Sequence, residues 1–191
     1  MKNDAVNIDM QKYRPLPFYF INTGDMNEYT QEKIDAKVKM LHDDGFGGAI
    51  LFNCANDGFD TDRYLTEDFF TMTERFILAA EKYGLKIWFT DGWRCPSGDV
   101  GDKVAKRNPK LCQRRLTRDA DGKVVPVDVP WGFPAFEEPE SSDLFIELVY
   151  ENYYKRLGKY FGNTLQGIFS DADNRRFDAF SAAMMQDEYY P

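Results

Sequence analysis

The sequence predicts an α/β fold built from four strand–helix units around a parallel sheet. Two observations lead to this prediction. Four short runs of apolar, β-branched and aromatic residues are spread along the chain, as is typical of strands buried on both faces. Longer segments with apolar residues at helical spacing lie between these runs, and strands that alternate with helices form parallel sheets with right-handed crossovers.

The first part of the chain contains a lead-in segment and two strands. Residues 1–14 are polar and precede the strand predicted at 16–22 (LPFYFIN). A helix begins at Thr30, carries apolar residues at helical spacing, and ends at Gly45, a residue type favoured just after a helix. The second strand is predicted at 48–53 (GAILFN).

The later units repeat this alternation. A second helix is predicted at 66–84, and a third strand follows at 85–90 (LKIWFT). A third long helix begins at Ser142, a fourth strand is predicted at 165–170, and a last helix at about 178–190. No shift in composition marks a domain boundary along this order.

The loop after the third strand, about residues 91–141, is too long to be structureless inside a domain. We therefore expect an insertion with its own structure. A short helix is predicted at 108–116 (NPKLCQRRL). A β-hairpin is predicted at 116–127, turning at the Asp-Gly pair 121–122, which suits a tight hairpin turn.

Four units leave two architectures open, because a closed parallel barrel needs eight strands. One is an open four-stranded sheet, whose two exposed edges are a liability for association. The other, which we adopt, is a partial (β/α) barrel domain over residues 15–191 that corresponds to the amino-terminal half of a TIM barrel. The remainder of the barrel would then be missing or supplied by a partner.

Charge and composition exclude several classes of function. The net charge of −8 argues against nucleic acid and against an anionic membrane surface, because both attract a basic face. No apolar run is long enough to span a membrane, and residues 1–12 contain no signal-peptide core, so a cytoplasmic location is the default expectation. Aromatic residues make up 16% of the chain, and aromatic rings fill cores or stack on sugar rings.

Cysteine and histidine usage argues against metal and triad chemistry. The three cysteines lack the spacing of a disulfide framework or a zinc site, and are expected to be reduced thiols. The single histidine, His42, lies near a predicted helix end and complements the helix dipole. The acidic run that begins at Asp171 fails the EF-hand pattern, because Arg176 and Ala182 replace its Gly and Glu. No metal and no cofactor are predicted.

Polar residues follow all four predicted strands. A parallel sheet gathers such residues on one rim, where α/β proteins bind ligands. In chain order these residues are Asn22, then Asn53, Asn56 and Asp57, then Asp91, Trp93, Arg94 and Ser97, and finally Asp171, Asp173, Arg175 and Arg176.

Two acids of this rim suggest a reaction. Adjacent strands lie about 5 Å apart, which brings Asp91 and Asp171 within plausible reach of each other. Paired carboxylates at such separations perform glycoside hydrolysis, in which one protonates the leaving oxygen and the other stabilises or attacks the anomeric carbon. Alternatively, each acid caps the helix that follows it, and the run 173–176 (DNRR) is a surface salt-bridge cluster.

Several strings resemble a known family. They include PFYFIN, IDAKVKMLHDDGFGGAILFN, EKYGLKIWFTDGWRCPSGDVG and YENYYKRLGKYFGNTLQGIFSDAD. In this order, from about residue 14 to 173, the chain resembles the amino-terminal half of the catalytic barrel in α-L-rhamnosidase-like glycoside hydrolases. The resemblance implies a (β/α) barrel that acts on a glycan.

The chain departs from that family at the acids. Family members show Asp-Glu after both the third and the fourth strand, followed in the first case by W-P-S-G. Gly92 and Ala172 stand at the two Glu positions here, and Cys95 precedes P-S-G. If the family's acid is the fourth-strand Glu, Asp171 or Asp173 has to stand in for it.

Three hypotheses follow. The first is a glycoside hydrolase in which Asp171 or Asp173 is the proton donor, Asp91 a supporting carboxylate and Trp93 a stacking platform for a sugar. The remaining rim residues predicted to bind the carbohydrate substrate are Asn22, Asn53, Arg94, Ser97, Arg175 and Arg176. The second is a degenerate, non-catalytic carbohydrate-binding or scaffold protein, which Gly92 and Ala172 favour. The third is a half-barrel that associates with itself through its exposed sheet edges.

Overall fold

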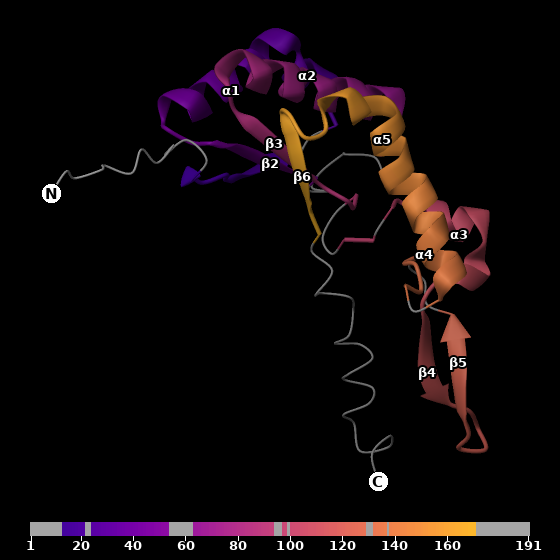
Figure 1. Ribbon diagram of the computed structural model, residues 1–191. Coiled ribbons are helices and arrows are strands. Elements are labelled where there is room, and N and C mark those ends of the chain that lie inside the picture. The colour runs from indigo at the N-terminus through magenta and orange to yellow at the C-terminus, as the bar shows by residue number, and fades with distance from the viewer. Residues whose placement is uncertain are drawn as a thin grey trace, which may run out of the picture.

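A four-stranded parallel sheet forms the frame of the molecule (Figure 1). The computed structural model describes residues 13–21, 24–53, 63–93, 97–98, 100–128, 132–136 and 138–170. The strands of the sheet are β1 (Phe18–Ile21), β2 (Gly48–Asn53), β3 (Lys86–Thr90) and β6 (Leu165–Phe169), and they lie in the order β1-β2-β3-β6. All three pairings are parallel. The predicted α/β class and its parallel sheet are confirmed.

Helices connect these strands. They are η2 (Met26–Tyr29), α1 (Gln31–Asp43), α2 (Glu67–Tyr83), and a continuous helical segment of α4 (Pro139–Ile146), η5 (Glu147–Glu151), α5 (Asn152–Leu157) and η6 (Gly158–Tyr160). The backbone of Lys33 donates to the Thr30 side chain at the start of α1, and Gly84 ends α2 with φ 68°. The third long helix begins at Pro139, three residues before the predicted start, because proline suits the first turn of a helix.

The insertion after β3 contains helices and a separate hairpin. Its elements are α3 (Lys103–Arg107), η4 (Pro109–Leu111), β4 (Arg114–Arg118) and β5 (Val124–Asp128). The hairpin prediction is confirmed, and Gly122 turns it with φ 77°. The helix predicted at 108–116 is confirmed only as the 3-10 helix η4 (Pro109–Leu111), and its second half is wrong. Asn108 is extended because it precedes a proline, and the chain from Arg114 onward pairs with β5 instead.

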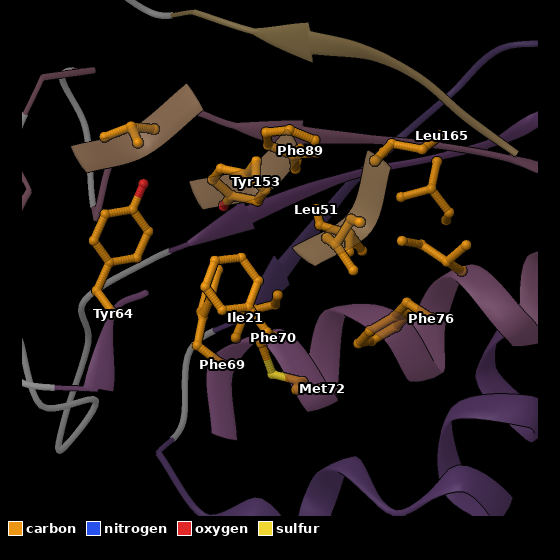
Figure 2. Packing of buried hydrophobic residues seen from close by; sticks show 14 of the residues in the cluster. Ile21, Leu51, Tyr64, Phe69, Phe70, Met72, Phe76, Phe89, Tyr153 and Leu165 are labelled. Carbon is orange, nitrogen blue, oxygen red and sulfur yellow. The ribbon is translucent and has the colours of Figure 1, made fainter. Parts of the chain in front are cut away.

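One face of the sheet packs against the helices and forms the core. Figure 2 shows Ile21, Leu51 and Phe89 from three neighbouring strands lying over Phe76 of α2 and Tyr153 of α5. The rings of Phe89 and Tyr153 stack with centroids 3.8 Å apart. All five side chains are at most 2% exposed. The alternation of strand residues therefore directs one set of side chains toward α1, α2 and α5.

The opposite face of the sheet carries aromatic side chains that are partly open to solvent. Phe18 and Phe20 of β1 are 43% and 53% exposed. The Phe18 ring lies 5.3 Å from Phe52 of β2 and 5.0 Å from Phe169 of β6. Because β1 and β6 are the two outer strands, the contact between Phe18 and Phe169 shows that the sheet is strongly curled toward this face.

A polar cluster at Glu74 joins α2 to the end of the last helical segment. The hydroxyl of Tyr160 donates to Glu74 Oε1 at 2.7 Å, and Lys159 Nζ lies 3.0 Å from the same oxygen. The hydrogen bond from Tyr160 has the larger effect and the contact with Lys159 the smaller, and together they hold the pKa of the Glu74 carboxyl below its ordinary value. Because the pKa of the Glu74 carboxyl is lowered in the folded state, its contribution to stability is fully present above the ordinary glutamate pKa. This contribution is lost as the pH falls from there through the lowered folded-state pKa.

We expect Glu74→Gln to lower the free energy of unfolding at pH 7 by less than about 1 kcal/mol, because the pair is partly exposed. The difference from the unmodified chain should be smaller at pH 3, because the pH has then fallen below the ordinary glutamate range toward the lowered pKa of the folded state. Urea unfolding at both pH values measures this, and Glu81→Gln on the exposed side of α2 is the control. Equal pH dependence for both variants would show that the Tyr160 and Lys159 contacts contribute nothing.

Candidate functional site

A buried carboxylate at the carboxyl end of β3 is the centre of the site. Asp91 directly follows the strand and is 2% exposed. The hydroxyl of Tyr150 donates to Asp91 Oδ2 at 2.6 Å. Asp91 Oδ1 is buried and accepts no hydrogen bond from any described residue. A buried polar atom without a partner is costly in a native protein, so it indicates that a ligand or ordered water completes the site.

Tyr150 reaches Asp91 from a π-helical turn. The turn η5 interrupts the long helical segment between α4 and α5, and such single turns are frequent at functional sites. Burial first, and then the hydrogen bond to Asp91 and its charge, raise the pKa of the Tyr150 phenol far above its ordinary value. Tyr150 therefore stays protonated at physiological pH and acts as a donor that fixes the orientation of the Asp91 carboxylate.

A cavity of about 280 Å³ opens beside these two residues. Besides Asp91 and Tyr150, its lining consists of three serines, one glycine and two phenylalanines. These are Ser97, Ser142 and Ser170, Gly98, and Phe136 and Phe145. This volume lies just below the range of roughly 300–1,000 Å³ typical of ligand pockets. The cavity therefore suits one small ring that carries hydroxyl groups and also has an apolar face.

A second hollow of about 450 Å³ adjoins the first. The two share Phe136, Ser142, Phe145 and Tyr150, and the second adds Ile146 of α4. The chain from β3, the insertion, α4, η5 and the end of β6 therefore builds one continuous depression that is polar at Asp91 and apolar at Ile146.

The insertion is held against this depression by close contacts. Ser142 Oγ donates to the Phe136 carbonyl at 3.0 Å, and Ser141 Oγ donates to the Leu111 carbonyl at 2.8 Å. Gly98 has φ 102°, and a Cβ at that position would lie 2.8 Å from the Phe136 ring. Only glycine allows this approach, so the turn at Ser97 and Gly98 is shaped to accept the phenylalanine.

Two predicted rim residues lie with Asp91, as the parallel sheet requires. Ser97 lines the same cavity. Asn53, at the end of β2, is 3% exposed and donates from Nδ2 to the Gly92 carbonyl at 3.1 Å. Asn53 thus fixes the backbone next to Asp91 rather than lining the cavity, and the residues after β2 and β3 do meet on one rim.

The position of Trp93 contradicts its predicted role as a stacking platform for a sugar. Its side chain is fully buried, and its ring lies 5.8 Å from that of Tyr64. A side chain with no exposed face cannot stack on a sugar, so the role of stacking platform is wrong for this arrangement. The turn after Asp91 carries the indole into the core instead, where it packs with Tyr64.

The other predicted site residues lie outside the described part of the chain. They are Asn22, Asn56, Asp57, Arg94, Asp171, Asp173, Arg175 and Arg176. Ser170, which lines the cavity, is the residue directly before Asp171 in the sequence.

The sequence prediction missed Tyr150, Ser142, Phe136 and Phe145. Tyr150 is one of three tyrosines in the run YENYY. Within a helical pattern, nothing distinguishes it from an ordinary core or surface residue. An excess of aromatic residues near the insertion was the only available signal. The π-helical turn that aims Tyr150 at Asp91 has no recognisable sequence signature.

The described part of the chain holds neither a metal-binding cluster nor a membrane-spanning helix. Within residues 13–170, apart from the gaps between the described ranges, no group of three His, Cys, Asp or Glu side chains is placed to hold a metal ion. Among the same residues, no helix has the length and apolar character needed to cross a membrane.

Comparison with family models, with curated proteins and with solved structures finds no match. The geometry of the pocket and the residues that line it therefore carry the functional argument.

Proposed function

We propose that the depression at Asp91 binds one ring of a glycan, and that the protein is a glycoside hydrolase. The single observation that carries this proposal is the buried carboxylate of Asp91, which Tyr150 holds at Oδ2 while Oδ1 has no protein partner among the described residues. Sugar hydroxyls are the natural donors for such an oxygen, and sugar ring faces pack on aromatic side chains such as Phe136 and Phe145.

The proposed reaction uses two carboxyl groups. Asp171 or Asp173, which follow the cavity residue Ser170, would protonate the glycosidic oxygen. Asp91, held by Tyr150, would stabilise the positive charge that develops at the anomeric carbon. The resemblance to α-L-rhamnosidase-like hydrolases supports this assignment, and so does a sheet whose strand order follows the chain, as in the amino-terminal half of a (β/α) barrel.

A second candidate is a non-catalytic carbohydrate-binding protein. Gly92 and Ala172 favour it, because the family that the chain resembles has glutamates at these positions. Such a protein would keep the Asp91 pocket and its affinity for sugar while lacking the proton donor.

We expect Asp171→Asn and Asp173→Asn to separate these candidates when tested on aryl glycosides. Loss of the proton donor should lower kcat by about 10²-fold or more. Asp91→Asn should lower kcat as well, and the control Asp143→Asn, on the exposed side of α4, should change nothing. Unchanged rates for both Asp171→Asn and Asp173→Asn would remove the hydrolase assignment.

Calorimetric titration with oligosaccharides tests the second candidate. Saccharide binding that Asp91→Asn weakens, without any turnover by the unmodified chain, would favour a binding protein. Neither binding nor turnover on a broad panel of glycans would reject both candidates.

A further inference from the structure

Three buried oxygen atoms at one end of the core share an unusual property. They are Asp91 Oδ1, the hydroxyl of Tyr64 and the hydroxyl of Tyr153, and none of them forms a well-aligned hydrogen bond with a described residue. All three side chains are at most 2% exposed. Buried polar atoms are almost always hydrogen-bonded in folded proteins, so three such oxygens in one region need a common explanation.

Different parts of the chain bring the three side chains together. Tyr64 precedes α2, Asp91 follows β3, and Tyr153 lies in α5. Both tyrosine rings contact Phe69 of α2, with ring centroids 5.1 and 6.0 Å away. In Figure 2, Tyr64 lies at the end of the core away from Leu165, the first residue of β6. This is the carboxyl end of the parallel strands, where Asp91 is located.

The two phenols interact with each other and with Asp91. Burial first, and then Tyr153 and the charge of Asp91, raise the pKa of the Tyr64 phenol. Burial also raises the pKa of the Tyr153 phenol most strongly, the neighbouring Tyr64 hydroxyl opposes this change, and the charge of Asp91 adds to it. Both phenols therefore stay protonated at physiological pH, and each is a hydrogen-bond donor close to the Asp91 carboxylate.

One water molecule matches this set of groups. A water accepts hydrogen bonds from two donors and donates to an acceptor, which suits two phenols and one carboxylate oxygen. Buried waters in proteins typically form about three hydrogen bonds to polar groups that have no other partner. A carboxylate oxygen has two acceptor positions, so Asp91 Oδ1 keeps one of them for a ligand in the cavity.

We propose that one buried water molecule is bound between Asp91 Oδ1 and the hydroxyls of Tyr64 and Tyr153, and that both tyrosines are positioning residues for Asp91. Tyr150, which lines the cavity, holds Oδ2 by its hydrogen bond of 2.6 Å. The water holds Oδ1 from the side of the core. The carboxylate is then fixed through both of its oxygens.

The two tyrosines act on a ligand only through Asp91. Neither of them is among the residues that line the cavity. Their contribution is to keep the carboxylate in one orientation, so that it presents a fixed acceptor to the cavity. This inference does not depend on the proposed function, because Asp91 is held in the same way for any ligand that carries a hydrogen-bond donor.

A high-resolution crystal structure of the full chain tests the water site. We expect electron density for one water molecule within hydrogen-bond distance of all three oxygens. Any other arrangement of these oxygens would overturn the proposal. Direct donation of either tyrosine hydroxyl to Asp91 Oδ1 is one such arrangement, and a gap without density between the three oxygens is another.

Carbon-13 NMR of the Asp91 carboxyl carbon tests the positioning role, and Asp91→Asn identifies the resonance by its loss. We expect Tyr64→Phe and Tyr153→Phe each to shift this resonance, because each removes a hydroxyl that holds the water. Tyr29→Phe is the matched control, since Tyr29 is 2% exposed and lies beside Phe76, with ring centroids 6.4 Å apart.

Circular dichroism establishes that each variant is folded. An Asp91 resonance that moves no more in Tyr64→Phe and Tyr153→Phe than in the Tyr29→Phe control would overturn the positioning role. A merely structural role for the two hydroxyls would lower the stability of the variants without changing the signal of this one carboxyl group.

Discussion

We expect Gly48→Ala to lower the free energy of unfolding by about 3 kcal/mol or more. This is the upper end of the range of destabilisation that single substitutions usually cause. Gly48 begins β2 and pairs in register with Lys86 of β3. A Cβ at this position would lie 1.8 Å from the Lys86 carbonyl oxygen and 2.6 Å from its carbonyl carbon. Both atoms belong to the backbone, so no rotation of a side chain relieves the clash. The two central strands have to separate at the start of their ladder.

Urea unfolding followed by circular dichroism measures this loss. Gly122→Ala, in the turn of the β4–β5 hairpin, is the matched control, because Gly122 also has a positive φ but has nothing within 4 Å of its Cβ direction. Its substitution should cost only the backbone strain, about 1–2 kcal/mol. A Gly48→Ala variant no less stable than Gly122→Ala would mean that β2 and β3 do not approach each other this closely.

Tyr153 is the second position where a large effect is expected. Its ring is fully buried, stacks on Phe89 with an angle of 9° between the planes, and lies edge-on to Phe69 and Phe70 (Figure 2). Tyr153→Ala removes a ring from the contact between α5, the sheet and α2. We expect the free energy of unfolding to fall by about 3–5 kcal/mol, as for other large aromatic truncations in cores.

The hydroxyl of Tyr153 should matter far less than its ring. Burial raises the pKa of this phenol, so the group is neutral, and it has no well-formed hydrogen bond to any described residue. Tyr153→Phe should therefore change the free energy of unfolding by less than about 1 kcal/mol. Thermal unfolding of both variants decides the matter. If Tyr153→Phe is as damaging as Tyr153→Ala, the hydroxyl has a partner and the ring stacking is not the dominant contribution.

Local signals account for the part of the fold that the sequence predicted well. The strand Gly48–Asn53 has the predicted bounds, because its apolar run is flanked by glycines and a polar loop. The helix before β3 ends at Gly84 in the left-handed conformation that only glycine adopts without strain. Both features depend on residues that are close together in the chain.

The errors occur where distant residues decide the structure. Arg114–Leu116 is strand because it pairs with β5 across the hairpin, although its own sequence resembles a helix end. Trp93 is buried because Tyr64, 29 positions earlier, occupies the space beside it. Tyr150 meets Asp91 because a π-helical turn shifts the phase of the helix, which a simple helical period does not anticipate.

The insertion after β3 adds walls to the depression but no strand to the parallel sheet. The β4–β5 hairpin extends away from the parallel strands (Figure 1). Ser97, Gly98 and Phe136, on either side of the hairpin in the insertion, form part of the cavity. Substitutions on the exposed hairpin can therefore accumulate without disturbing the sheet. Val100, Val104 and Leu111 of the same segment are buried in the core, so the wall of the cavity is tied to the stability of the whole fold.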